Sequence, residues 1–115
     1  MEQTDEGIKA RDFVNRVLPV ALEMMKGKAE KFDCVVGLHL LGEDGGKWTL
    51  RLKKGEVSVE EGITDYWDCA LNIPAGDYLA MAAGTLSPYQ AMAKGKIGVS
   101  GNLGLAAKLR FLFRV

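Results

Sequence analysis

Between residues 32 and 73 the chain alternates apolar and polar side chains with a period of two. Successive side chains of a β-strand point to opposite faces of a sheet, so this alternation predicts half-buried strands. Glycine-containing connections divide the region, and strands are expected over residues 32–41, 47–53, 56–60 and 66–73. The four strands should form a meander with one apolar face, which other elements must cover.

Residues 6–26 repeat apolar side chains at the spacing of an amphipathic helix. Pro19 lacks the N–H that a helix interior requires, so the helix either kinks there or restarts with Pro19 in its first turn. Gly27 is expected to end this helix, because glycine is the residue most often found just past a helix terminus.

Helical signals return after residue 73. Pro74 suits the first position of a helix that ends at Gly84. Ser87 and Gln90 have the spacing of a capping box, which predicts a second short helix that ends at Gly95.

The last part of the chain predicts one more strand and one more helix. Residues 96–100 alternate again, and Asn102 is a favourable cap for a final helix that begins at Leu103. A sheet with one apolar face, preceded by one helix and followed by three, is an α+β arrangement of two layers. The helices are therefore expected to share one face of the sheet.

Length and charge limit the class of protein. We expect residues 1–115 to form a single domain, since a chain of this length can bury a self-sufficient core. Fifteen basic and fifteen acidic residues cancel, which leaves little electrostatic attraction toward nucleic acid or an anionic bilayer. No apolar run has the length of a membrane-spanning segment, so we expect a soluble, cytoplasmic protein.

The two cysteines, Cys34 and Cys69, lie in apolar runs without CxxC spacing or clustered histidines. This context predicts buried, reduced thiols and no metal site. No motif indicates a cofactor.

The final helix is more apolar than one buried face requires. On a helical wheel it carries two adjacent apolar stripes, one of Leu105, Ala106, Leu109, Leu112 and Phe113, and one of Leu103, Ala107 and Phe111. The sheet can cover one stripe. The other must contact further helices, another subunit or a bound apolar molecule, and ordinary core packing is the simplest of these alternatives.

Catalytic residues are not indicated. His39 is the only histidine, and the alternation places it on the polar face while Cys69 points to the apolar face. Asp68 also falls on the polar face. An enzyme acting on an apolar thioester through His39 and Cys69 is thus disfavoured. A phosphate-binding loop formed by Gly98, Gly101 and Gly104 is a further alternative, without the GxGxxG spacing.

The order of these elements resembles the sterol carrier protein 2 (SCP-2) domain family. The resemblance covers residues 13–113 and rests on Gly84-Thr85-Leu86-Ser87-Pro88, on residues 91–102 (Ala-Met-Ala-Lys-Gly-Lys-Ile-Gly-Val-Ser-Gly-Asn), and on the apolar helix that follows. Ser87 and Asn102 stand where members of the family usually have Asp. Both substitutes cap helices, so the fold should be little affected.

The resemblance implies a five-stranded, mostly antiparallel sheet with helices on one face that enclose a hydrophobic tunnel. It further implies non-catalytic binding of a fatty acid, an acyl-CoA, a sterol or a similar apolar molecule. The expected tunnel wall consists of Trp67, Leu79, Met92, Ile97, Val99, Leu103, Leu105, Leu109, Leu112 and Phe113. Met24, Met25, Met81 and Met92 are candidates for adapting the wall to ligands of different shape.

An interaction module is the alternative function. Some domains of this family support enzymes of lipid or quinone metabolism, and the surplus stripe of the final helix would then be buried between chains. A homodimer is one form of this alternative.

Overall fold

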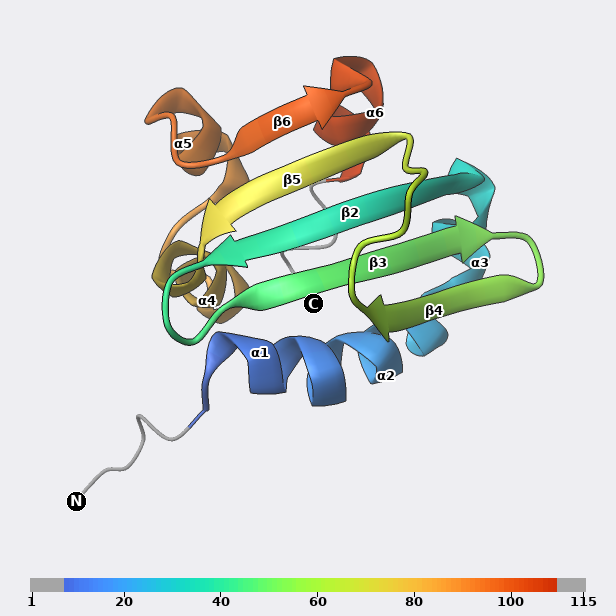
Figure 1. The fold of residues 1–115 in the computed structure, drawn as a ribbon, viewed down its shortest axis with the longest axis horizontal. Helices are drawn as coiled ribbons and strands as arrows, with labels where there is room; N and C mark the ends of the chain where they lie inside the picture. Colours follow the sequence, from blue (N-terminus) through green and yellow to red (C-terminus); the bar gives the residue numbers. More distant parts are fainter. Residues whose placement is uncertain (1–7, 110–115) are drawn as a thin grey trace.

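The computed structural model describes residues 8–109, and its centre is a five-stranded sheet (Figure 1). The strands lie in the order β4-β3-β2-β5-β6. Their bounds are Cys34–Leu41 for β2, Gly46–Lys53 for β3, Glu56–Glu61 for β4, Cys69–Pro74 for β5 and Gly98–Gly101 for β6. All five predicted strands are confirmed, with ends that differ by up to three residues.

The sheet is mixed, and the predicted meander is wrong at β5. The pairs β2–β3, β3–β4 and β5–β6 are antiparallel, as expected, but β5 pairs with β2 in parallel instead of with β4. A parallel partner requires a connection that crosses the sheet. Residues 62–68 make that crossing in front of β3 and β2 (Figure 1). Alternation alone cannot reveal which strands are neighbours.

The N-terminal helical region is divided into short segments. They are α1 (Ala10–Asp12), the π-helix η1 (Phe13–Val17), α2 (Leu18–Met24), α3 (Lys26–Ala29) and the 3₁₀-helix η2 (Glu30–Phe32). Pro19 lies in the first turn of α2, which confirms the predicted restart. Just before it, the Leu18 N–H donates to the Phe13 carbonyl, and this bond over five residues is the mark of a π-helix.

Two predicted boundaries in this region are wrong. Gly27 lies inside α3 instead of ending a helix, and the break falls at Met25, whose φ of −112° and ψ of 28° are not helical. Phe32, expected to begin a strand, ends the 3₁₀-helix. The following residue, Asp33, adopts a left-handed conformation with φ of 48°, so the chain turns before β2 begins.

The helices after the sheet follow their capping signals. They are α4 (Ala75–Ala83), α5 (Pro88–Ala93) and α6 (Leu103–Lys108). Gly84 ends α4 in the left-handed region, as predicted. Pro74 is a correction, because it is the last residue of β5 and precedes the helix instead of occupying its first position.

One face of the sheet forms the core. The register brings Val36 opposite Leu50 and Cys69, and Leu38 opposite Trp48 and Leu71, so these apolar side chains share a face. They are buried. Trp48 also donates from Nε1 to Asn15 Oδ1 of η1 at 2.8 Å, which satisfies the indole N–H inside this layer.

The crossing segment covers part of the opposite, open face. Gly37 has no side chain on this face, so the crossing segment can pack close to β2. A Cβ on Gly37 would lie 3.3 Å from Ile63 Cδ1 and 3.7 Å from Trp67 Cδ1. Trp67 therefore packs on the open face, which corrects its predicted place on the apolar side. The reason is that β5 begins only at Cys69, so Trp67 belongs to the crossing segment and does not follow the alternation.

Asp68 fixes the crossing segment to the sheet. Its Oδ2 accepts a hydrogen bond from the Val35 N–H at 2.7 Å, and its own N–H donates to the Val35 carbonyl at 2.8 Å. Oδ1 accepts from the Tyr66 hydroxyl. The Asp68 carbonyl accepts from the Asn102 N–H at 3.1 Å, which ties in the start of α6. A Cβ on Gly101 would lie only 2.6 Å from that carbonyl oxygen, so glycine is needed here.

These hydrogen bonds predict a pH-dependent contribution from Asp68. The bonds from Tyr66 and from the Val35 N–H lower the pKa of the Asp68 carboxyl below its ordinary value of 3.8. A lowered pKa in the folded state stabilises the protein above the pKa of the unfolded chain, and this stability is lost as pH falls through the folded value. We expect Asp68→Asn to lower the free energy of unfolding by about 1 kcal/mol at neutral pH.

Urea denaturation at neutral pH and again in acid measures this effect. The difference between wild type and Asp68→Asn should shrink as the wild-type carboxyl becomes protonated. Asp65→Asn is the matched control, because Asp65 is an exposed carboxylate on the same crossing segment. An equal loss of stability in both variants, or a loss that is independent of pH, contradicts the assigned role.

Candidate ligand-binding site

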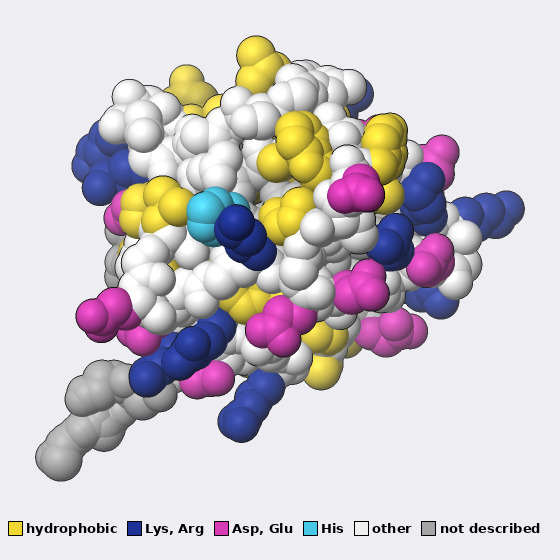
Figure 2. Space-filling view, in the orientation of Figure 1, with side chains coloured by type: hydrophobic (Ala, Val, Ile, Leu, Met, Phe, Trp, Pro, Cys, Tyr) yellow, Lys and Arg dark blue, Asp and Glu magenta, His cyan; other side chains and the backbone are white. Residues whose placement is uncertain are grey.

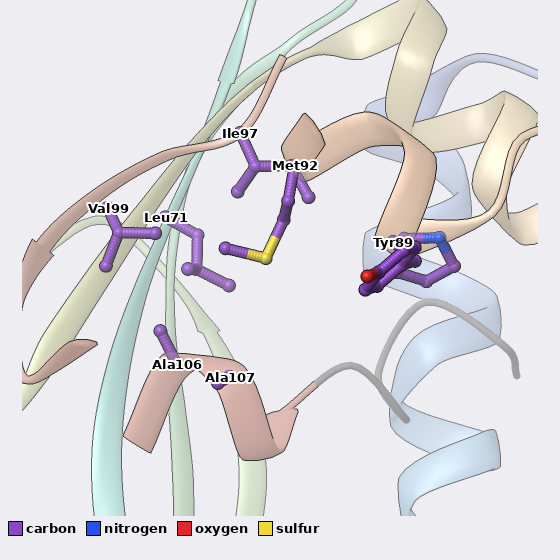
Figure 3. Close-up of a pocket in the computed structure, with 8 residues that line it drawn as sticks. Leu71, Tyr89, Met92, Ile97, Val99, Ala106 and Ala107 are labelled. Carbon is purple, nitrogen blue, oxygen red and sulfur yellow. The ribbon is translucent and has the colours of Figure 1, made fainter. Parts of the chain in front are cut away.

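A pocket of about 180 Å³ lies between α5, α6 and the β5–β6 edge of the sheet (Figure 3). The side chains around it come from four elements and from the residues just before β6. They are Leu71, Pro88, Tyr89, Met92, Ile97, Val99, Ala106 and Ala107. None of the eight is charged. The pocket can hold an apolar group, and the Tyr89 hydroxyl is the one titratable group among these eight side chains.

The capping box of α5 places one wall. Ser87 Oγ accepts from the Gln90 N–H at 3.0 Å, and Gln90 Oε1 accepts from the Ser87 N–H at 3.3 Å, as the sequence predicts. With the first turn fixed, Tyr89 and Met92 lie three residues apart on one side of the helix. Tyr89 is 81% exposed and Met92 is 47% exposed. Both residues therefore form the rim of the pocket as well as part of its lining.

The sheet provides the opposite side. Leu71 of β5 pairs directly with Val99 of β6 in the antiparallel ladder, so both side chains lie on the helix-covered face. Ile97 precedes β6 and points toward the same space (Figure 3). These branched side chains give the pocket an apolar floor.

The start of α6 closes the third side. Asn102 Oδ1 accepts from the Leu105 N–H at 2.9 Å, which confirms the predicted cap. Ala106 and Ala107 follow on this helix and line the pocket. Their small side chains leave space between α6 and Met92 that longer side chains would fill.

Only part of the predicted wall lines the pocket. Met92, Ile97 and Val99 are brought together there. Leu109 is fully buried in the core, and Leu79 and Leu105 pack against that core. Leu103 is 67% exposed and, like Trp67 on the open face, is not part of the lining. Leu112 and Phe113 lie outside the described residues, as does Phe111 of the second stripe.

The prediction missed five lining residues, namely Leu71, Pro88, Tyr89, Ala106 and Ala107. Tyr89 could have been predicted, because it precedes Met92 by three residues and therefore lies on the same side of the helix that the capping box starts. The alanines had no comparable signal, because they line the pocket by being small. Of the four methionines expected to adapt the wall, Met92 alone lies in this pocket, while Met24 is exposed and Met81 is buried.

The candidate catalytic groups lie on opposite faces of the sheet. His39 is on the open face, visible in Figure 2, where its Nδ1 lies 3.1 Å from Asn72 Oδ1. Cys34 and Cys69 are free and buried on the core face. Burial, reinforced by the neighbouring Cys69 thiol, raises the pKa of Cys34 to about 12, and burial raises that of Cys69 to about 11. Thiols with such pKa values are poor nucleophiles at neutral pH.

Other site classes receive no support from residues 8–109. No group of three His, Cys, Asp or Glu side chains in this range could hold a metal ion. No helix in the same range is long and apolar enough to cross a membrane. Gly101, considered above for a phosphate-binding loop, is explained instead by its close approach to the Asp68 carbonyl.

Comparison with known proteins agrees with the fold. The sequence profile of the SCP-2 sterol transfer family matches residues 14–114, which is most of the chain. The chain belongs to this family. The α+β fold and the resemblance identified from the sequence are thereby confirmed.

Individual members of the SCP-2 family show how far the likeness extends. Hydroxysteroid dehydrogenase-like protein 2 of Mus musculus is 38% identical over 79 residues, which are 68% of this chain and 16% of that protein. The chain thus spans about a sixth of that relative. The sterol carrier protein domain 2 of Helicoverpa armigera is 26% identical with a TM-score of 0.75, covering 99% of this chain and 92% of that one.

A structure described as palmitated belongs to SCP2L2 of Aedes aegypti. It is 27% identical to this chain with a TM-score of 0.64, and the likeness covers 82% of this chain and 91% of that one. This chain therefore shares its fold with a protein whose structure was solved in a palmitated form.

The buried thiols lead to a chemical prediction. Iodoacetamide at neutral pH should leave both cysteines of the folded protein unmodified, because their raised pKa values keep almost all of each thiol protonated. Protein unfolded in urea should gain two additions by intact mass spectrometry. Fast alkylation of Cys69 in the folded protein would contradict this prediction and would indicate that its thiol is reactive.

Proposed function

We propose that this chain binds an apolar small molecule in the pocket between α5 and α6 and carries it without chemical change. The observation that supports this proposal is the uncharged, apolar lining that residues 71–107 give to that pocket. Transfer of apolar surface out of water would supply the affinity. The ligand classes in question are fatty acids, acyl-CoA thioesters and sterol-like lipids.

The size of the pocket favours a linear chain over a rigid ring system. A cavity of ~150 Å³ with an apolar lining holds a molecule such as benzene, and this pocket has about 180 Å³. It would take a segment of about six carbons, with the remainder of the ligand leaving between Tyr89 and Ala107. Burial of about six methylenes is worth roughly 5 kcal/mol before the cost of association.

The palmitated relative from Aedes aegypti supports the same choice, since its acyl chain is linear. We therefore place fatty acids and their thioesters ahead of sterols as ligands of this chain. The rigid sterol ring system would need more enclosed space than the described residues provide.

Filling the pocket should abolish binding. Ala107 is exposed on the solvent side of α6 yet lines the pocket, so Ala107→Trp can place an indole in the mouth without disturbing the core. We expect at least a tenfold loss of affinity for a fluorescent fatty acid, which equals about 1.4 kcal/mol. Fluorescence titration and displacement by unlabelled palmitate measure the effect.

Ala93→Trp is the matched control. Ala93 is exposed on α5 but does not line the pocket, so this variant should bind as the wild type does. Native mass spectrometry of the purified protein provides a second measurement, because a carrier should retain organic-soluble material. Equal binding by the two variants, or a wild-type protein that binds no fatty acid, rejects the proposal.

An interaction module is the second candidate, and a groove on the N-terminal helices favours it. Arg16, Val17, Val20, Ala21 and Met24 line this shallow groove, in which Val20 is 59% and Met24 84% exposed. Unpartnered apolar side chains at helical spacing are typical of contact surfaces. If this groove joins two copies of the chain, light scattering should report a dimer for the wild type and a monomer for Met24→Glu. A monomeric wild-type protein would contradict the homodimer hypothesis.

A further inference from the structure

The two edges of the sheet are protected to different degrees. β4 forms one edge, has three glutamates among its six residues and contacts α2. β6 forms the other edge and has the sequence Gly-Val-Ser-Gly, without a charged residue or a proline. Charged side chains, prolines and covering helices are usual means of preventing an edge strand from pairing with another chain. The β6 edge lacks the charges of β4, and its length limits pairing to a few residues.

The outer side of β6 is open to a further strand. No strand among residues 8–109 pairs with that side, and in Figure 1 β6 is the outermost strand, with α5 at one end and α6 at the other. Gly98, Ser100 and Gly101 are exposed, and Val99 is half-buried. Because alternate residues of a strand direct their N–H and C=O groups to opposite neighbours, some of these groups in β6 have no partner strand.

The pocket adjoins this edge. Val99 of β6 and Ile97 just before it line the pocket, with α5 on one side and α6 on the other (Figure 3). A residue added directly opposite Val99 would point to the same face of the sheet, with its Cβ about 5 Å from that of Val99. Its side chain would therefore enter the space between α5 and α6. The pocket of about 180 Å³ has room for a phenyl or isobutyl group, because an apolar cavity of ~150 Å³ holds benzene.

The surroundings of the pocket are basic. Residues 69–115 contain one acidic and five basic residues. The acidic residue, Asp77, pairs with Lys96, whose Nζ lies 3.5 Å from Oδ1. In the part of the chain that the structure describes, Lys94 and Lys108 form no ion pair. Lys94 directly follows α5 and Lys108 ends α6, so a partner with carboxylates would complement the helices that bound the pocket.

We infer that β6 accepts an extended, acidic peptide segment of a partner protein as a sixth strand. One large apolar side chain of this segment, opposite Val99, occupies the pocket, and its carboxylates face Lys94 and Lys108. Backbone hydrogen bonds to β6 supply part of the affinity, while the pocket and the lysines select the sequence, which is the usual division of roles in strand addition. The partner therefore competes with an apolar ligand for the same space, a consequence that rests on the proposed carrier function.

A second copy of this chain fits the edge less well. In a pair of two β6 strands, the side chain directed at the pocket would be a valine or the hydrogen of a glycine, and both are smaller than the space. The second strand would also bring no carboxylate for Lys94 and Lys108. A peptide with alternating side chains can supply both groups.

Selection from a phage-displayed library of random dodecapeptides tests for such segments. The ligand-free protein should enrich peptides that combine a large apolar residue with Asp or Glu a few positions away. Fluorescence anisotropy then measures the affinity of a synthetic copy. Lys94→Glu with Lys108→Glu should weaken binding by about tenfold, whereas Lys31→Glu with Lys54→Glu, an equal change of charge at exposed positions away from the pocket, should leave it nearly unchanged.

Backbone chemistry distinguishes strand addition from other modes of binding. N-methylation of alternate residues of the peptide should abolish binding in one register and preserve it in the other, because only every second N–H of an added strand points toward β6. Amide exchange measured by NMR should slow within Gly98–Gly101 and stay unchanged in β4. An equal effect of N-methylation at every position would contradict strand addition.

Competition tests where the apolar side chain lies. The peptide should displace a fluorescent fatty acid, and Ala107→Trp should weaken the binding of both. Simultaneous binding of peptide and fatty acid, no enriched peptide, equal effects of the two lysine pairs, or a dimer in light scattering that buries β6 overturns the inference. Peptide binding without any fatty-acid binding rejects the carrier proposal alone, so the two failures are distinguishable.

Discussion

The parallel pairing of β5 with β2 is the constraint on which the rest of the structure depends. It forces residues 62–68 across the open face, where Asp68 fixes them by two hydrogen bonds to Val35. It also leaves the far side of β5 free to pair with β6. The helices that flank β6 are consequently held at that edge of the sheet, and the pocket forms between them. Without this crossing, α5 and α6 would have no common surface to cover.

Much of the fold follows from short-range patterns that can be recognised directly in the sequence. The alternation between residues 32 and 73 predicts the strands because half-buried strands require it. Ser87 with Gln90, and Asn102, predict the starts of α5 and α6 because those side chains satisfy backbone N–H groups that a helix leaves unpaired. These signals act over three or four residues and do not depend on the remainder of the chain.

The features that the sequence did not predict depend on contacts between distant segments. Nothing in residues 56–73 indicates that β5 leaves β4 to join β2, and Trp67 therefore appeared to belong to the apolar face. The lining of the pocket was also difficult to predict, because it too depends on contacts between distant segments. Ala106 and Ala107 line it by leaving space, and the absence of a larger side chain has meaning only once Leu71, Met92 and Val99 are known to lie opposite.

The two tryptophans end up on opposite sides of the sheet, and this arrangement makes each a reporter of a different layer. Trp48 is buried on the helix side with its indole bonded to Asn15, so its emission follows the packing of the N-terminal helices. Trp67 lies in the crossing segment against Gly37 and Gly101, so its emission follows the attachment of that segment to the open face. Single-tryptophan versions of the chain could thus distinguish the loosening of one layer from the loosening of the other during unfolding.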